Sequence, residues 1–157
     1  MGLSPEISTL LTAMTPIGEL RIALPVAIAS YKMNIGVAYF LSVLGNMLPV
    51  FVLLLFWRYL VKFFIKNFKI CDKFFNWLFS RTRKKFEGKY EKWGKLALIL
   101  FVAIPLPITG AWTGSVAAWL FGFRYWESVG LIFLGVLISG VVVTVLTIGG
   151  VGLFSLS

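Results

Sequence analysis

The stretch that decides the fold is Ala103-Ile104-Pro105-Leu106-Pro107-Ile108-Thr109-Gly110, which interrupts an apolar segment running from Leu96 to Phe123. About 20 helical residues cross the roughly 30 Å core of a bilayer, so this segment is too long for one ordinary crossing. Two prolines two residues apart remove backbone donors and disfavour helix before each of them. We therefore expect two half-helices, Leu96 to Ile104 and Ala111 to Phe123. Non-helical backbone at membrane depth must be buried in protein or reached by water, so the break predicts a cavity.

A second broken segment, Pro16-Ile17-Gly18-Glu19-Leu20-Arg21-Ile22-Ala23-Leu24-Pro25, lies inside the apolar stretch from Ile7 to Ser30. A simple lipid-facing helix would not place Glu19 and Arg21 at the bilayer centre. A re-entrant hairpin explains the pattern better. Its first arm is expected from Ile7 to Met14, its tip from Thr15 to Glu19 and its second arm from Leu20 to Ser30. Four prolines are expected to mark the hairpin breaks: Pro16, Pro25, Pro105 and Pro107.

Two further segments, Ile35 to Trp57 and Ser128 to Gly150, contain no charged residue and are each long enough for a full crossing. The whole chain is 59% hydrophobic and 13% charged, against roughly 45–50% apolar residues in soluble domains. These patterns predict an all-α integral membrane protein.

The basic residues are concentrated between the two halves, where 12 of the 15 Lys and Arg residues fall from Arg58 to Lys95. Four of them follow helical spacing and predict an interfacial amphipathic helix that contacts anionic lipid headgroups: Lys62, Lys66, Lys69 and Lys73. The positive-inside rule makes this linker cytoplasmic and both termini external. Because the charge sits beside a highly apolar remainder, nucleic-acid binding is not expected.

The chain thus reads as one membrane domain, residues 1–157, with a hairpin and a span in each half: repeat one at 1–57, the linker at 58–95 and repeat two at 96–157. Each half crosses the membrane once, so the halves must have opposite orientation, as in inverted-repeat transporters. An offset of 90 residues places Gly45 on Gly135 and Val26-Ala27 on Val116-Ala117. Lys32, an external charge in this topology, counts against it.

Several functions are disfavoured by composition. The chain has no histidine and one cysteine, Cys71, so it lacks the residues for Ser-His-Asp catalysis, an internal disulfide or the usual zinc spacings. We expect no enzyme activity, no metal and no cofactor.

Glu19 and Arg21 are the charged residues within the membrane-inserted segments and are therefore candidate binding residues. Arg21 would bind an anionic group while Glu19 takes up and releases a proton. Alternatively, the two residues pair internally and hold the fold together. Asn46, near the middle of the first span and one turn before Pro49, is a further candidate, or marks only a proline kink.

The second tip offers hydroxyls and backbone donors in place of charge. Thr109 is expected to cap the arm that begins at Gly110, whose helix N-terminus would favour anions. Thr113 and Ser115 follow in the same arm. The alternative is a packing ridge of small residues, Gly110, Gly114 and Ala118.

The two broken segments resemble those of the small multidrug export family of prokaryotes, over nearly the whole chain. More distantly they are similar to the paired hairpins of the DedA family, whose members are implicated in moving polyprenyl-phosphate lipids. That family places acidic and arginine residues at both tips, whereas this second tip is uncharged. The resemblance implies a multi-pass protein of a prokaryotic cell membrane, and it carries over the fold, Glu19 and Arg21.

We therefore expect a transporter that moves an amphipathic substrate by alternating access, with an anionic lipid phosphate as the leading substrate class. With two full spans the monomer is small, so a homodimer is expected. One alternative is a proton-coupled exporter of small cationic drugs. Another is a membrane scaffold that organises lipid or partners through its basic linker and transports nothing.

The inverted topology can be tested by cysteine accessibility in a variant lacking Cys71. A cysteine at position 32 should be labelled from the side opposite to one at position 84, because the first segment returns to the face it entered. Labelling of both positions from the same side would mean that the first segment crosses the bilayer.

Overall fold

The computed structural model describes residues 3–67, 77, 89–106 and 109–154 of the chain, and the regular structure in these residues is helical. The elements are α1 (Pro5–Met14), α2 (Glu19–Pro25), the π-helix η1 (Val26–Ser30), α3 (Ile35–Asn67), α5 (Lys89–Ala103), α6 (Ala111–Leu120) and α7 (Tyr125–Phe154).

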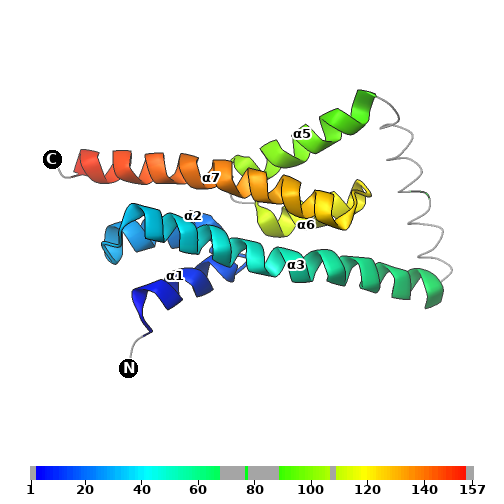
Figure 1. Ribbon diagram of the computed structural model, residues 1–157, viewed down its shortest axis with the longest axis horizontal. Coiled ribbons are helices and arrows are strands. Elements are labelled where there is room, and N and C mark those ends of the chain that lie inside the picture. The colour runs from blue at the N-terminus through cyan, green and yellow to red at the C-terminus, as the bar shows by residue number, and fades with distance from the viewer. Residues whose placement is uncertain (1–2, 68–76, 78–88, 107–108, 155–157) are drawn as a thin grey trace.

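Two of these helices, α3 and α7, are long and apolar enough to cross a membrane, over Ile35–Leu60 and Tyr125–Gly150 in the described part of the chain. They lie side by side and antiparallel (Figure 1). The Tyr39 hydroxyl donates to the carbonyl of Leu137 at 2.9 Å, and the Tyr125 hydroxyl donates to the carbonyl of Phe51 at 3.3 Å. The two bonds are twelve residues apart on each helix, about 18 Å. They fix the register of the pair.

The first broken segment forms a short helix, a turn and a second short helix, in the arrangement expected. α1 begins at a favourable cap, since the Ser4 hydroxyl accepts the Ile7 N–H and Pro5 fills the first helical position. It ends at Met14, because Thr15 is extended and precedes Pro16. The second arm starts at Glu19 and continues to Ser30.

Pro25 does not break this arm, so the expectation of a hairpin break there is wrong. The α-helix passes directly into η1, where the Tyr31 N–H donates to the Val26 carbonyl five residues earlier. The arm therefore stays helical through Pro25 and changes to π-type hydrogen bonding directly after it.

The second broken segment also has the expected order. α5 ends at Ala103, two residues before Pro105, and α6 begins at Ala111. α5 starts at Lys89, seven residues before the expected start at Leu96. The expected boundary followed the apolar composition, whereas the helix continues into the polar residues that precede it.

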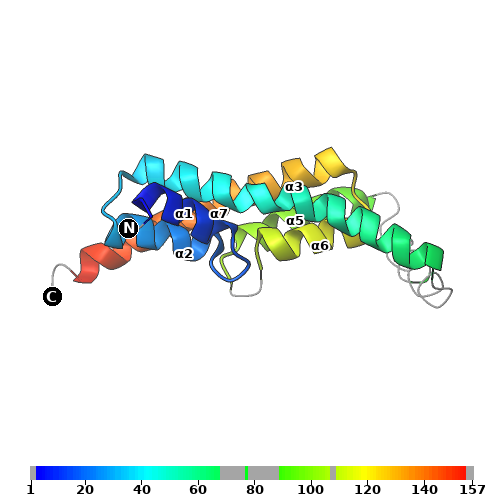
Figure 2. The ribbon, with the colours of Figure 1, turned by 90° about the horizontal axis from the view of Figure 1, so that it is seen from below.

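The four shorter α-helices, α1, α2, α5 and α6, pack against the two long helices α3 and α7. α1 packs on α3 and α5 packs on α7, while α2 and α6 each contact both long helices. Figure 2 shows α1 and α2 in one half of the molecule and α5 and α6 in the other. Large buried side chains at this junction are Leu20, Leu24, Val50, Leu98, Val102, Ile132 and Val136.

Two glycines allow the first arm of each pair to approach its long helix. A Cβ at Gly45 would lie 2.5 Å from the Leu10 carbonyl oxygen of α1. A Cβ at Gly135 would lie 2.9 Å from the Ile99 carbonyl oxygen of α5. These close backbone approaches place the two tips at a common depth along the long pair.

The basic linker falls mostly outside the described residues. Lys62 and Lys66 lie on the last turns of the α3 backbone, while Lys69 and Lys73 are outside the described residues. The helix continues past Trp57, where the first span was expected to end.

Replacement of Gly45 by valine should lower the free energy of unfolding in detergent by about 1–3 kcal/mol, because the side chain overlaps the α1 backbone. Thermal unfolding followed by circular dichroism measures the change. Gly130→Val is the matched control, since a Cβ at Gly130 has no neighbour within 4 Å. Equal destabilisation by both variants would contradict the packing described here.

Candidate functional site

The site is centred on Glu19, the first residue of α2, which is buried with 7% of its surface exposed. Its backbone has a φ of 43°, in the left-handed region that costs a non-glycine residue about 1–2 kcal/mol. Such strain persists only where surrounding contacts hold the residue in place. Here the Glu19 N–H donates to the Thr15 carbonyl and the side chain reaches across to α6.

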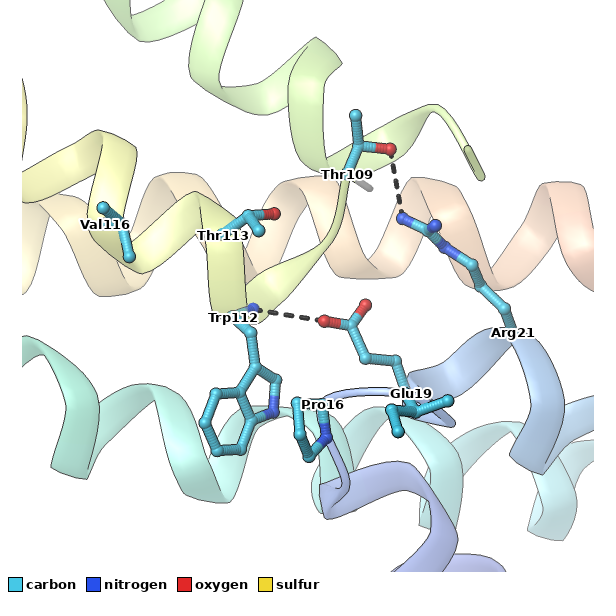
Figure 3. Close-up of a pocket in the computed structure, with 8 residues that line it drawn as sticks. Pro16, Glu19, Arg21, Thr109, Trp112, Thr113 and Val116 are labelled. Atoms are coloured by element: carbon cyan, nitrogen blue, oxygen red, sulfur yellow. Dashed lines mark hydrogen bonds between the residues drawn. The ribbon is translucent and has the colours of Figure 1, made fainter. Parts of the chain in front are cut away.

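The Glu19 carboxylate caps the N-terminus of α6 from the opposite helix pair. Oε1 accepts the backbone N–H of Trp112 at 3.3 Å (Figure 3). α6 has no side-chain cap from its own segment. A carboxylate at this position satisfies a donor that the helix leaves unpaired and is favoured by the positive end of the helix dipole. The contact joins the two tips directly.

Gly110 makes this contact sterically possible. A Cβ at Gly110 would overlap the Glu19 carboxylate, while the glycine backbone itself is extended and unstrained. The absence of a side chain therefore serves the approach of Glu19.

Thr109 is not the cap of α6, so that expectation is wrong. The N-cap residue is Gly110. The Thr109 hydroxyl is committed to the proline break, where it donates to the Ile104 carbonyl at 2.7 Å and accepts the Leu106 N–H at 3.2 Å. The prolines leave these backbone groups without helical partners, and the hydroxyl supplies one.

Arg21 projects from α2 toward the same break. Its Nη2 donates to the Thr109 hydroxyl at 3.1 Å (Figure 3). This is the hydrogen bond that the guanidinium makes among the described residues, although a guanidinium carries five N–H donors. Thr109 thus fixes the position of Arg21 and leaves most of its donors available.

The Trp112 side chain makes a second hydrogen bond between the two tips. Its indole Nε1 donates to the carbonyl of Met14 at 3.2 Å, a group left over at the end of α1. With its backbone N–H on Glu19, Trp112 binds both the last turn of α1 and the first turn of α2.

A cavity of about 400 Å³ lies between the tips. Figure 3 shows the side chains that surround it. The lining residues are Pro16, Ile17, Glu19, Arg21, Thr109, Trp112, Thr113 and Val116. Charged, hydroxyl and apolar groups therefore share one wall, which suits an amphipathic ligand.

A narrow interior space adjoins the cavity and reaches the long helices. It is lined by Glu19, Leu20, Arg21, Asn46, Val102, Gly110, Ala111, Val136 and Ser139. Asn46 and Ser139 each lie within two residues of the middle of their apolar spans. Of the residues lining the cavity or this space, Glu19 and Arg21 are the charged ones.

The structure thus gathers most of the candidate residues. Glu19, Arg21, Thr109 and Thr113 line the cavity, and Asn46 and Gly110 line the interior space beside it. Ser115 is fully buried, and its hydroxyl donates to the Trp112 carbonyl at 2.6 Å, so it belongs to the helix packing.

Two residues near the site were not identified from the sequence. Trp112 resembled an ordinary apolar helix residue, and its place in the first turn after the break was the available signal. Ser139, in the uncharged second span, is the other residue. In the described residues no group of three or more His, Cys, Asp or Glu side chains could hold a metal ion.

Fold and site together define a helical membrane protein with a charged and apolar cavity between two broken helical segments. A family model described as "Putative small multi-drug export protein" matches residues 19–142, and the chain belongs to this family. The match begins at Glu19 and covers both the second break and most of each long helix. No curated protein and no solved structure matched the chain. The family description is that of an exporter.

Replacement of Gly110 by alanine should reduce the free energy of unfolding by about 1–3 kcal/mol, because the new methyl group displaces the Glu19 carboxylate. In a Glu19→Ala background the same replacement should cost much less. The coupling is measured by a double-mutant cycle from denaturant unfolding in detergent.

Gly114→Ala provides the control for this cycle, because a Cβ there meets Val102 and not Glu19. Its cost should be the same in both backgrounds. If the cost of Gly110→Ala is also independent of Glu19, the carboxylate does not occupy the position described.

Proposed function

We propose that the protein transports an amphipathic substrate with an anionic head group, which binds in the cavity between the two tips. The leading substrate class is an anionic lipid phosphate such as a polyprenyl phosphate. The observation that carries the proposal is the state of Arg21, whose guanidinium lines the cavity and is anchored by Thr109 through one hydrogen bond. Its remaining donors suit the oxygen atoms of a phosphate or carboxylate.

The other charge in the cavity favours an anionic over a cationic substrate. The Glu19 carboxylate already accepts a backbone N–H of α6 and lies tight against Gly110. A cationic drug would have to compete with these contacts and with the neighbouring Arg21. An anion meets Arg21 directly.

Glu19 can couple transport to protons. While Glu19 is ionised, the charges of Glu19 and Arg21 balance across the cavity. Protonation of Glu19 leaves Arg21 as the unbalanced charge, and a cavity with an unbalanced cation binds an anion more strongly. Proton uptake and substrate binding would therefore favour each other.

The depth of the site supports a transport path. Asn46 and Ser139 lie near the middle of the two apolar spans and line the space behind the cavity. Transporter sites commonly lie at the bilayer midplane between broken helices. We propose that α1–α2 and α5–α6 are re-entrant hairpins that enter from opposite faces.

Correspondences at an offset of 90 residues support an inverted repeat. α3 begins at Ile35 and α7 at Tyr125. The turn before each long helix contains a residue with positive φ, Lys32 at 51° and Gly122 at 74°. Gly45 and Gly135 receive the first arm of each pair. Two similar units of opposite orientation can exchange conformations, which is the basis of alternating access in such folds.

The assembly and orientation follow the same proposal. The basic linker would lie on the cytoplasmic side of a prokaryotic cell membrane and bind anionic headgroups. A homodimer would enclose the path more fully than two spans can alone.

Arg21→Ala should abolish uptake of a fluorescent polyprenyl phosphate analogue into proteoliposomes, while Arg21→Lys should retain part of it, because lysine keeps the charge but not the forked geometry. Initial rates at equal protein content measure the effect. Arg58→Ala is the control, since Arg58 is exposed on α3 and does not line the cavity. Wild-type rates in Arg21→Ala would exclude the cavity as the head-group site.

A further inference from the structure

We propose that Asn46 accepts a hydrogen bond from the protonated form of Glu19. On protonation the Glu19 side chain then moves from the N-terminus of α6 to Asn46 on α3. This inference rests on the proposed function, in which Glu19 takes up the proton that is coupled to transport. It assigns Asn46 as the acceptor of the hydrogen bond that the protonated Glu19 donates. It concerns a positioning residue, since Asn46 acts through Glu19.

Asn46 has an acceptor that the rest of the fold leaves unused. The residue is 3% exposed, and its Oδ1 has no hydrogen-bond partner in the described part of the chain. A buried acceptor without a partner destabilises the folded state. Such groups call for a partner that the structure supplies in another state.

Glu19 borders the same narrow space as Asn46 and changes its hydrogen-bonding character on protonation. An ionised carboxylate only accepts hydrogen bonds, whereas a protonated carboxyl group also donates one. The ionised form suits the Trp112 N–H, which it contacts at 3.3 Å. The protonated form requires an acceptor, and Asn46 Oδ1 is the unpaired one that lines this space.

The surroundings of Glu19 offer few competing partners. Arg21 on α2 and the backbone N–H of Trp112 on α6 are donors, so neither can accept the proton's hydrogen bond. Ser139 on α7 borders the space with a hydroxyl, and α5 contributes the apolar Val102. Among the described residues that line this space or the cavity, Arg21 is the charged side chain besides Glu19 itself.

Movement of Glu19 toward Asn46 has a consequence at the tips. The movement breaks the hydrogen bond between the Glu19 carboxylate and the Trp112 N–H. Trp112 then contacts the first tip through the hydrogen bond from its indole to the Met14 carbonyl. The proton comes from water on one side, binds a carboxyl oxygen and returns to water on the other. No other covalent bond is made or broken.

Infrared spectroscopy of the protein in lipid bilayers tests this assignment without a transport assay. The C=O stretch of protonated Glu19 is identified as the band that appears at low pH and is absent in Glu19→Gln. In Asn46→Leu the band should move to higher frequency, because the carboxyl group loses its partner. The proton affinity of the group should fall about tenfold, so the band should appear about one pH unit lower, as expected for the loss of one hydrogen bond.

Ser42→Ala is the matched control. Ser42 is fully buried on α3, one turn before Asn46, and its hydroxyl is also unpaired in the described residues, but it does not line the space with Glu19. Its band and midpoint should equal those of the wild type. Asn46→Ala replaces Asn46→Leu if the leucine variant does not purify in folded form.

A Glu19 band unchanged in frequency and midpoint in the Asn46 variant would overturn the inference, whatever the protein transports. An equal change in Ser42→Ala would also overturn it, since the effect would then be general to α3. Failure of the proposed function is separate, because it appears as normal uptake by Arg21→Ala.

Discussion

The contact between the Glu19 carboxylate and the first turn of α6 is the interaction on which the site depends. It joins two residues that are 93 positions apart in sequence and belong to different helix pairs, and both residues line the cavity. Its physical basis is the unpaired N–H groups at a helix N-terminus, which in an apolar environment require an acceptor. Gly110, the left-handed backbone of Glu19 and the indole of Trp112 all serve this single junction.

The two charged residues of the cavity, Glu19 and Arg21, have different hydrogen-bond partners at this junction. The Glu19 carboxylate is held by the backbone N–H of Trp112, and the Arg21 guanidinium is held by the Thr109 hydroxyl. A charge with few protein partners is the one that a substrate can engage, and this difference between Arg21 and Glu19 is the basis of the proposed anionic head group. The apolar lining residues Ile17, Trp112 and Val116 leave room for the adjoining hydrophobic part of such a molecule.

Much of the fold could be read from the sequence because proline and apolar length act locally. Pro16 and Pro105 each follow the end of a helix, and the long uncharged segments became α3 and α7. The expectation for Pro25 was wrong because the helix continues through the proline and passes into η1, which the local sequence did not indicate. The expectation that Thr109 caps α6 was wrong for a related reason. Its hydroxyl bonds to the Leu106 N–H and the Ile104 carbonyl at the proline break, and not to the first turn of α6.

The sequence by itself determined which two segments are long and apolar enough to cross a membrane, where the other two apolar segments are broken and which charged residues lie near those breaks, since these follow from composition and backbone chemistry. Only the tertiary structure decided that Glu19 caps α6, that Arg21 rests on Thr109 and that Asn46 borders the same space. The reason is that each of these contacts joins residues distant in the chain. Their meeting depends on how closely α1 and α5 approach the long helices at Gly45 and Gly135.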